Sequence, residues 1–338
     1  MFREAISRFV PTPLSRLNQC AMSISTRRQF LLQTLPPLLL PTISRPSPAT
    51  ANGLSSQPST DDPISIGIIT DTHIGLAEDA AWRLRMFLQQ MGQQKPQAIL
   101  QMGDFAYPQA EHQKLFDAFN ELGPQPLHVI GNHDYDHNLT AQDCLERWDM
   151  PARYYNQALG AINVIVLDGN EKGSPSGRGG YPAYIGLEQQ AWLEEQLQQT
   201  TSPVLIVSHQ PLAGQAELDN ASEMRQLLAK YSEKILLCLN GHSHVDQLLI
   251  DQRVTYLHIN SASYYWLGGK ERWAAYTDPL FATLTIDLAA KQILIKGTRS
   301  SWKTNAPEQI GYFEKREPKL RQIVTPQILT RCLARHTG

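Results

Sequence analysis

Five short polar segments combine imidazole, carboxylate and amide side chains, which are groups that bind transition-metal ions. They hold five of the ten histidines of the chain and no cysteine. This donor set favours Zn, Mn or Fe over calcium or a soft metal. Two such ions about 3.5–4 Å apart can hold a phosphate during an in-line displacement and activate a water near neutral pH. The segments are Asp71-Thr72-His73, Gly103-Asp104, Gly131-Asn132-His133-Asp134, Ser208-His209 and Asn240-Gly241-His242-Ser243-His244.

Each polar segment follows an apolar run that predicts a β-strand. In open α/β sheets, ligands bind in the crevice beyond the carboxyl ends of the strands, so we expect the five loops to meet at one rim. Glycines directly before Asp104, Asn132 and His242 permit tight turns there. The predicted strands are Ile64–Thr70, Ala98–Met102, Leu127–Ile130, Val204–Val207 and Ile235–Leu239.

The remaining elements predict an α/β fold. Helical spacing at Ala80–Met91, Glu111–Leu122 and Leu187–Gln199, with a further strand at Ile162–Leu167, gives a βαβα alternation and partly parallel, buried sheets. After Gly241 helical periodicity is missing, and we expect a second, largely antiparallel sheet there. The two mixed β-sheets flanked by helices would form a four-layer αββα sandwich. The late strand-like runs are Gln247–Ile250, Val254–Ile259, Phe281–Asp287 and Gln292–Lys296.

In order, D-x-H, G-D, G-N-H-D, a single His and G-H-x-H resemble the calcineurin-like metallophosphoesterase superfamily, over Ile66 to about Val245. The D-x-H motif resembles the branch that includes class III cyclic-nucleotide phosphodiesterases. The resemblance implies a phosphate-ester hydrolase with two divalent or trivalent ions (Fe, Mn or Zn). It implies one ion held by Asp71, His73, Asp104 and His244, and a second held by Asp104, Asn132, His209 and His242.

The resemblance also implies roles around the ions. A hydroxide that bridges the ions would attack phosphorus, while His133 would contact the phosphoryl group and protonate the leaving oxygen. Asp134 would orient His133 or shape its loop. Tyr107 stands where several branches have Asp and where purple acid phosphatases have an iron(III)-binding Tyr. Because His73 already fills that coordination place, we expect Tyr107 to pack near the site, and its role as a ligand stays open.

Two further segments are expected near the rim. The glycine-rich stretch from Asp168 to Gly186 is either a lid, with Arg178 clamping a substrate phosphate, or a mobile surface loop. Tyr264, Tyr265 and Trp266 either stack on an aromatic group of the substrate or pack beneath the site.

The first 51 residues resemble a twin-arginine signal peptide. Arg27-Arg28 precedes an apolar stretch, and Ala49-Thr50-Ala51 is suited to cleavage. The stretch is too short and too interrupted to span a bilayer in the mature protein. We therefore expect the twin-arginine translocase as a partner, a periplasmic or extracellular location and no mature transmembrane anchor; the alternative is a disordered cytosolic N-terminus. The start is Met1 or Met22, and the expected order is signal 1–51, disordered linker 52–62, metallophosphoesterase domain 63–312 and C-terminal extension 313–338.

The net charge of the chain after residue 51 favours some classes of substrate over others. Residues 1–51 hold six Lys/Arg and one Asp/Glu, which leaves 24 basic and 31 acidic residues and a net charge of −7 in the rest. Such a body disfavours nucleic acid, so a small phosphorylated substrate is expected. A phosphodiester is slightly favoured, because Arg178 is the one strong candidate for binding a monoester dianion. The alternatives are a non-specific acid or alkaline phosphomonoesterase and a non-catalytic metal- or nucleotide-binding protein of the cell envelope.

Overall fold

The structure is a computed structural model that describes residues 62–176, 180–270, 272–315 and 318–334. The expected signal and all but the last residue of the linker lie outside these ranges, as does Arg178. Residues 60–338 form one compact unit. In the described part of the chain, no helix is long and apolar enough to cross a membrane.

The first six-stranded sheet is built from both ends of this unit. Three parallel strands lie beside three antiparallel strands, and β1 pairs with β12 where the two halves join. The strand order is β14 (Arg331–Ala334), β13 (Gln292–Gly297), β12 (Ala282–Asp287), β1 (Ile64–Ile69), β2 (Ala98–Met102) and β3 (Pro126–Val129).

The second six-stranded sheet comes from the middle of the chain. Its four central strands are parallel, and an antiparallel strand closes each edge. The strand order is β4 (Tyr155–Leu159), β5 (Ile162–Leu167), β6 (Val204–Ser208), β7 (Ile235–Asn240), β9 (Val254–His258) and β8 (Gln247–Asp251).

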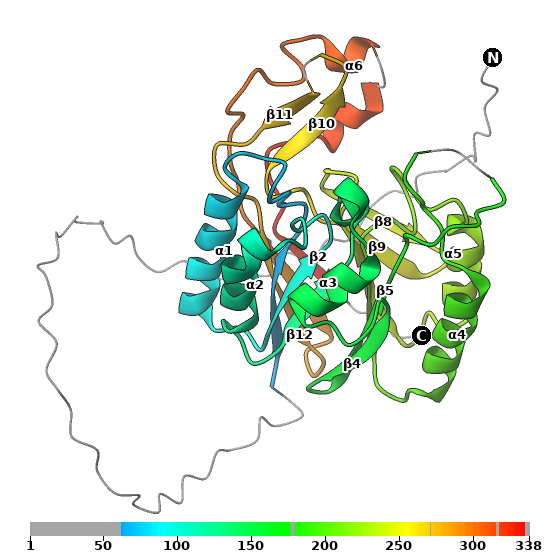
Figure 1. Cartoon of the computed structure of the whole chain (residues 1–338). Helices are drawn as coiled ribbons and strands as arrows, with labels where there is room; N and C mark the ends of the chain where they lie inside the picture. Colours follow the sequence, from blue (N-terminus) through cyan, green and yellow to red (C-terminus); the bar gives the residue numbers. More distant parts are fainter. Residues whose placement is uncertain (1–61, 177–179, 271, 316–317, 335–338) are drawn as a thin grey trace, which may run out of the picture. The chain divides into compact units, whose positions relative to one another are not determined.

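The alternation of side chains along a strand explains the layers. In β6, Leu205 and Val207 belong to the core shared with the first sheet, whereas Val204 and Ile206 pack with the helices on the other face. Helices α4 (Leu187–Gln199) and α5 (Ala221–Ala229) cover the second sheet. The helices that pack onto the first sheet are α1 (Ala80–Gln94), α2 (Gln113–Asn120) and α3 (Ala141–Trp148). The predicted four-layer αββα sandwich of two mixed sheets is confirmed (Figure 1).

The expectation of a separate late sheet is wrong. Strands β8 and β9 extend the second sheet beside β7, and β12 and β13 extend the first sheet beside β1. The physical reason is that β1 and β7 are buried apolar strands, whose free edges would expose unpaired backbone groups. Late strands that cover those edges satisfy these groups, which a separate sheet would not do.

The C-terminal segment is also part of the domain. Phe313, Leu320 and Ile328 are buried in the main core, and β14 completes the first sheet. Arg331 donates to both carboxylate oxygens of Asp246, at 2.8 and 2.7 Å. The sequence predicts a C-terminal extension from residue 313. Instead, apolar side chains of this segment pack into the domain, and it includes α6 (Tyr312–Lys315) and the 3-10 helix η3 (Pro318–Gln322).

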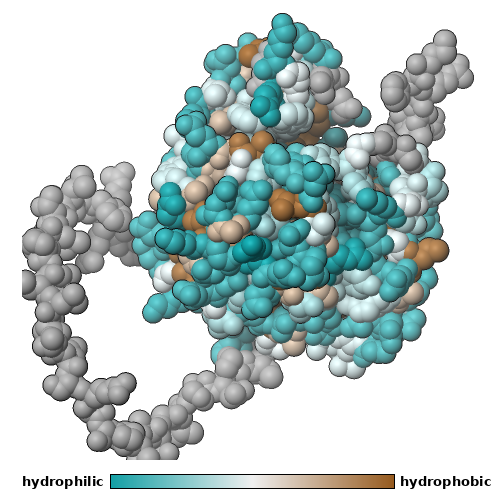
Figure 2. All heavy atoms as spheres, viewed as in Figure 1, coloured by the Kyte–Doolittle hydropathy of each residue, from teal (hydrophilic) through white to brown (hydrophobic). Residues whose placement is uncertain are grey.

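A hairpin of β10 (Tyr264–Gly268) and β11 (Arg272–Ala275) forms a separate two-stranded sheet. Figure 1 shows it in one lobe with α6. The surface in Figure 2 is mostly hydrophilic on this side, with a few apolar residues gathered where that lobe meets the body. Two further 3-10 helices, η1 (Ala110–His112) and η2 (His133–Asn138), follow β2 and β3.

Candidate metal centre

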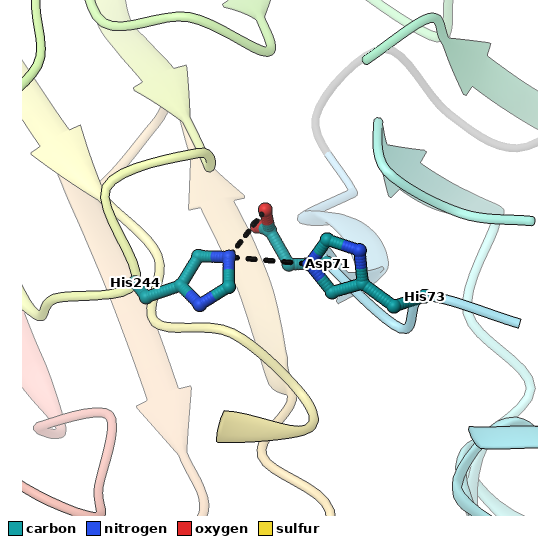
Figure 3. A group of neighbouring side chains, drawn as sticks. All are labelled: Asp71, His73 and His244. Carbon is teal, nitrogen blue, oxygen red and sulfur yellow. Dashed lines mark hydrogen bonds and ion pairs between the residues drawn. The ribbon is translucent and has the colours of Figure 1, made fainter. Parts of the chain in front are cut away.

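Two groups of three potential ligands lie at the carboxyl ends of the strands. In each group the candidate ligand atoms lie within 4.8 Å of one another. Figure 3 shows the first group, in which His244 Nε2 lies 3.1 Å from Asp71 Oδ1 and 3.3 Å from His73 Nε2. The second group is Asp104, His209 and His242.

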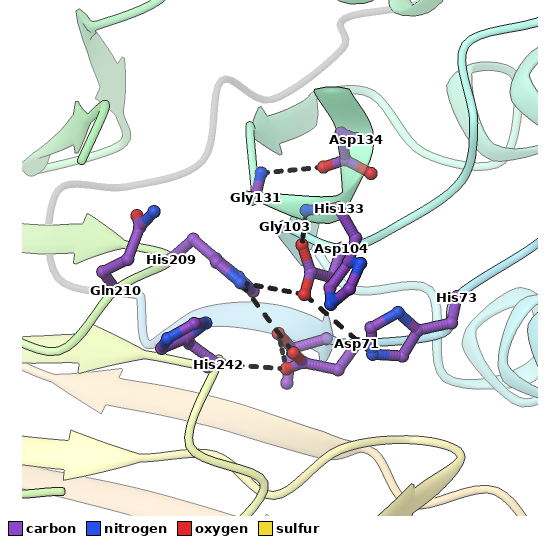
Figure 4. Close-up of polar contacts among 12 residues, drawn as sticks. Asp71, His73, Gly103, Asp104, Gly131, His133, Asp134, His209, Gln210 and His242 are labelled. Carbon is purple, nitrogen blue, oxygen red and sulfur yellow. Dashed lines mark hydrogen bonds and ion pairs between the residues drawn. The ribbon is translucent and has the colours of Figure 1, made fainter. Parts of the chain in front are cut away.

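The two groups are contiguous. Asp104 Oδ2 lies 3.2 Å from His209 Nε2 in its own group and 4.0 Å from His73 Nε2 in the other (Figure 4). Asp71 Oδ1 lies 3.9 Å from His209 Nε2. Both carboxylates therefore face imidazoles of both groups, an arrangement suited to two neighbouring cations that share a ligand.

The loops hold five of these residues in an unusual backbone conformation. Asp71, His73, Asp104, His242 and His244 have φ between 47° and 64°. Non-glycine residues rarely adopt this left-handed region, and such strain persists where the surrounding structure fixes it, often at functional sites.

Glycine makes the close approach of two loops feasible. A Cβ on Gly131 would lie 2.1 Å from the backbone nitrogen of Asp104. A larger residue at this position would push the second and third polar loops apart, and with them Asn132 and Asp104.

Hydrogen bonds set the imidazole tautomers. The carbonyl of Met102 lies 2.8 Å from His209 Nδ1, and the carbonyl of Tyr264 lies 2.7 Å from His244 Nδ1. A carbonyl only accepts, so each Nδ1 carries a proton and each Nε2 points into the cluster, where it is the nitrogen available to a metal ion. This is the orientation that a metal ligand needs.

Several polar atoms of the cluster are buried without a hydrogen-bond partner among the described residues. They include Asp71 Oδ1, Asn132 Oδ1 and His209 Nε2. An unpartnered buried polar atom is costly. Because all three belong to groups that bind cations, the residues present fit two metal ions.

The protonation states fit as well. Burial opposes the charge of Asp71, but His244 and His209 together outweigh it and lower the pKa of that carboxyl to about 2. Burial lowers the pKa of His73 and of His242 to about 3, which keeps both rings neutral. Burial also disfavours charge on His209, but Asp104 outweighs it and raises the pKa to about 9. A cation would displace that proton, because a ligating imidazole must be neutral.

His133 lies beside the cluster and is tied to it through the backbone. Its N–H donates to Asp104 Oδ1 at 2.8 Å, and its side chain is 31% exposed. Its Nδ1 lies 2.7 Å from Asp136 Oδ2. The Tyr181 hydroxyl donates to Asp136 Oδ1 at 2.6 Å and lies 3.2 Å from the same Nδ1.

Sequence reasoning missed both Asp136 and Tyr181. The signal for Asp136 was its place three residues after His133 within η2. Tyr181 comes from a distant loop, and nothing in its local sequence points to His133.

Asp134 occupies a different place. Its Oδ1 accepts from the backbone N–H groups of Phe105 and Ala106, at 3.0 and 3.2 Å, and its Oδ2 accepts from Gly131 at 2.7 Å. Burial, with Asp104 nearby, holds the pKa of this carboxyl well above its usual range. Of the two roles expected for Asp134, shaping the loops matches these contacts, and the carboxylate on His133 is that of Asp136.

The ring of Tyr107 packs over Gly75 and meets the ring of His137 edge-on at 4.7 Å. Burial raises the pKa of the Tyr107 hydroxyl, as do the carboxylates of Asp136 and Asp104.

A cavity of about 940 Å³ opens over the cluster. It is lined by several candidate ligands, which include His73, Asp104 and His242, and by His133. Aromatic side chains, which include Tyr264 and Trp266, also line it, together with Arg272. The ring of Tyr264 is buried and stacks on His73, with centroids 4.9 Å apart.

Comparison with known proteins places this geometry in context. The family model described as calcineurin-like phosphoesterase matches residues 64–246. A probable cyclic nucleotide phosphodiesterase from Synechococcus sp. is 27% identical over 197 residues, which cover 54% of this chain and 73% of that protein.

Two solved structures share the fold. A dimetal phosphatase from Danio rerio matches with a TM-score of 0.56 at 16% identity, over 72% of this chain and all of that chain. GAP50, described as the anchor in the inner membrane complex of Plasmodium, matches with a TM-score of 0.52 at 13% identity, over 75% of this chain and 93% of that one.

Proposed function

Because this chain belongs to the calcineurin-like phosphoesterase family, we propose that it hydrolyses phosphate esters at a dinuclear metal centre, with phosphodiesters preferred. It is a metallophosphoesterase, and the family normally binds two divalent metal ions. One observation carries the proposal: Asp104 and Asp71 each face imidazoles of two adjoining ligand groups.

Different residues would hold each of the two metal ions. Asp71, His73 and His244 would hold one ion; His209, His242 and the amide oxygen of Asn132 would hold the other, with Asp104 shared between them. When bound, the ions would supply positive charge for the phosphate oxygens and would lower the pKa of a bound water so that it could attack phosphorus. Fe, Mn and Zn all suit these donors.

His133 would act on the leaving group. Its Nδ1 is engaged by Asp136, which leaves Nε2 for the oxygen that departs from phosphorus. A proton donated there, or a hydrogen bond to the developing charge, lowers the barrier to cleavage. Asp136 and Tyr181 position the ring and do not touch the reacting atoms.

A diester suits the charge of the cavity. Among the described residues that line it, Arg272 is the only Lys or Arg, and it lies on the hairpin. A monoester dianion would need further cationic groups. The phosphodiesterase relative from Synechococcus supports the same preference.

The test is an assay of the purified protein after metal analysis, on bis(4-nitrophenyl) phosphate and on 4-nitrophenyl phosphate with added Mn²⁺. We expect faster hydrolysis of the diester. Loss of a shared ligand in Asp104→Asn should lower kcat by more than about 100-fold, since changes outside the ligand set already cost about 10–100-fold. His133→Ala should lower kcat by about 10²-fold or more with metal still bound.

Other outcomes point elsewhere. Faster hydrolysis of the monoester would indicate a phosphomonoesterase. Metal uptake without turnover of any phosphate ester would indicate the envelope binding protein instead.

We further propose that the chain is exported through the twin-arginine route to the periplasm or beyond. The order of Arg27-Arg28, apolar stretch and Ala49-Thr50-Ala51 supports this. That route carries folded proteins, so the metal ions would be bound before export.

A further inference from the structure

The β10–β11 hairpin is anchored in the domain although it belongs to neither large sheet. A lone two-stranded hairpin has little stability of its own in water. Here Tyr265, Leu267 and Ala274 bury one face in the main core. The buried guanidinium of Arg83 donates to the carbonyls of Ala262, before β10, and Tyr276, after β11, and so holds both strands at the base of the hairpin. The hairpin is therefore held firmly against the rest of the domain.

Its other face carries a stack of rings that begins at the metal centre. Cross-strand pairing of Trp266 with Trp273 and the two-residue period of β10 place Tyr264, Trp266 and Trp273 on this face. The ring centroids of Tyr264 and His73 are 4.9 Å apart, and those of Tyr264 and Trp273 are 5.0 Å apart, all nearly parallel. The guanidinium of Arg272 lies 4.6 Å from the centroid of Trp273.

Trp266 lies on this face of the hairpin and borders the cavity. It lines the cavity and is 50% exposed, although large apolar side chains are usually covered. Arg272 lines the same cavity and adds positive charge and planar donors. A phosphate fills little of a cavity of about 940 Å³, and cavities of roughly 300–1,000 Å³ hold whole organic ligands.

We propose that the Trp266 face of the hairpin binds the organic group of the phosphate ester, and that this group is a nucleobase. Its ring stacks on Trp266, and Arg272 donates to its acceptor edge. The inference rests on the proposed phosphodiesterase function and makes Trp266 a specificity-determining residue. Stacking on an aromatic side chain tolerates different bases, so the ring matters more than its identity.

Two diesters with the same leaving group test this: thymidine 5′-(4-nitrophenyl phosphate) and the analogous ester of 2-deoxyribose, which lacks the base. We expect the wild-type protein to have a higher kcat/KM for the thymidine ester. The ratio of the two kcat/KM values should fall about tenfold in Trp266→Ala, as expected from removal of one base-stacking partner. Trp266→Phe should keep most of the ratio, because it keeps a ring.

The matched control is Trp82→Ala. Trp82 is also a partly exposed tryptophan, 37% exposed on α1, but it does not line the cavity. This substitution should leave the ratio as in the wild type. A wild-type ratio near one, or an unchanged ratio in folded Trp266→Ala, would overturn the proposal.

Binding separates this proposal from the proposed function. If neither ester is hydrolysed, the proposed activity fails, but the subsite is still tested by quenching of tryptophan fluorescence. Adenosine 5′-monophosphate should quench the wild type and Trp82→Ala more than ribose 5-phosphate does. No such difference, or an equal difference in Trp266→Ala, would refute the subsite.

Discussion

At the scale of single residues, the cluster combines contacts that the sequence reveals with others that it does not. The ligand-type residues could be predicted because each lies one to four residues beyond a buried strand, as Asp71 lies two residues beyond β1 and His209 one residue beyond β6. Two features could not be predicted. One is the left-handed φ of Asp104 and His244, because aspartate and histidine adopt positive φ more often than most residues but still prefer negative φ. Tyr181 reaches Asp136 only through tertiary folding.

The contact between His133 and Asp136 should matter most when the leaving group is poor. Asp136→Asn should lower kcat about 10–100-fold on an alkyl diester, with little change in KM. The loss should be smaller with a 4-nitrophenyl leaving group, which departs without much help from a proton. Steady-state kinetics on both substrates, with the metal content measured, checks this prediction. Equal losses on both would mean that Asp136 serves structure alone.

Asp134 should behave differently. Asp134→Ala leaves the backbone N–H groups of Phe105, Ala106 and Gly131 without their acceptor. Since a buried donor without a partner costs about 1–3 kcal/mol, the free energy of unfolding should fall by at least about 2 kcal/mol. Urea unfolding of the metal-free protein measures it, and Asp136→Ala, at a more exposed position, is the control. Equal stability of wild type and Asp134→Ala would contradict the loop-shaping role.

At the scale of elements, segments with a strong apolar pattern could be predicted and segments with a weaker pattern could not. The sequence predicted α4 and β2 with the bounds that the structure has, because each has a strong apolar pattern. It missed α3, α5 and β4: β4 has the same five-residue length as β2 but carries the polar Asn156 and Gln157, while α3 did carry a capping-box signal at Thr140 and Asp143. Pairing of the late strands with different sheets depends on free edges elsewhere in the fold, which no local pattern encodes.

Arg83 joins α1 to the base of the aromatic hairpin. It is fully buried, pairs with Asp79 at 2.8 Å and donates to two hairpin carbonyls. Arg83→Met should lower the free energy of unfolding by about 3 kcal/mol or more, because it leaves these acceptors unpaired. The control is Lys303→Ala, which removes an exposed partner of Asp79 and should cost under about 1 kcal/mol. A small effect of Arg83→Met in urea unfolding would count against this anchoring role.

His128, on strand β3, makes the free energy of unfolding depend on pH. Burial lowers the pKa of His128 to about 3, from 6.5. Below pH 6.5 the unfolded state binds a proton that the folded state excludes, so this histidine makes stability fall as pH drops from 6.5 toward 3. His128→Gln should reduce the slope of unfolding free energy against pH by up to about 1.4 kcal/mol per unit. Urea titrations between pH 7 and 4 with chelator measure it, and an unchanged slope would refute it.

At the scale of the whole molecule, the export signal and the catalytic domain can be tested separately. Replacing Arg27 and Arg28 together by Lys should leave the full-length precursor in the cytoplasm, because the paired guanidinium groups identify the signal. Arg45→Lys, which lies outside the motif and is present with either start, is the matched control. Fractionation followed by mass measurement of the protein checks this. Export of the double variant, or a wild-type protein that stays inside uncleaved, would exclude the twin-arginine route.

The division of the first sheet between early and late strands has a consequence in time. During synthesis β1, β2 and β3 emerge first, yet their neighbours β12, β13 and β14 emerge last. The second sheet draws on one continuous stretch and can assemble while the ribosome is still working. Pairings between distant segments form slowly and leave apolar edges open meanwhile. The nascent chain therefore passes through an interval in which the first sheet still lacks β12, β13 and β14, and the apolar residues that these strands cover stay exposed. In that interval chaperones would be most needed.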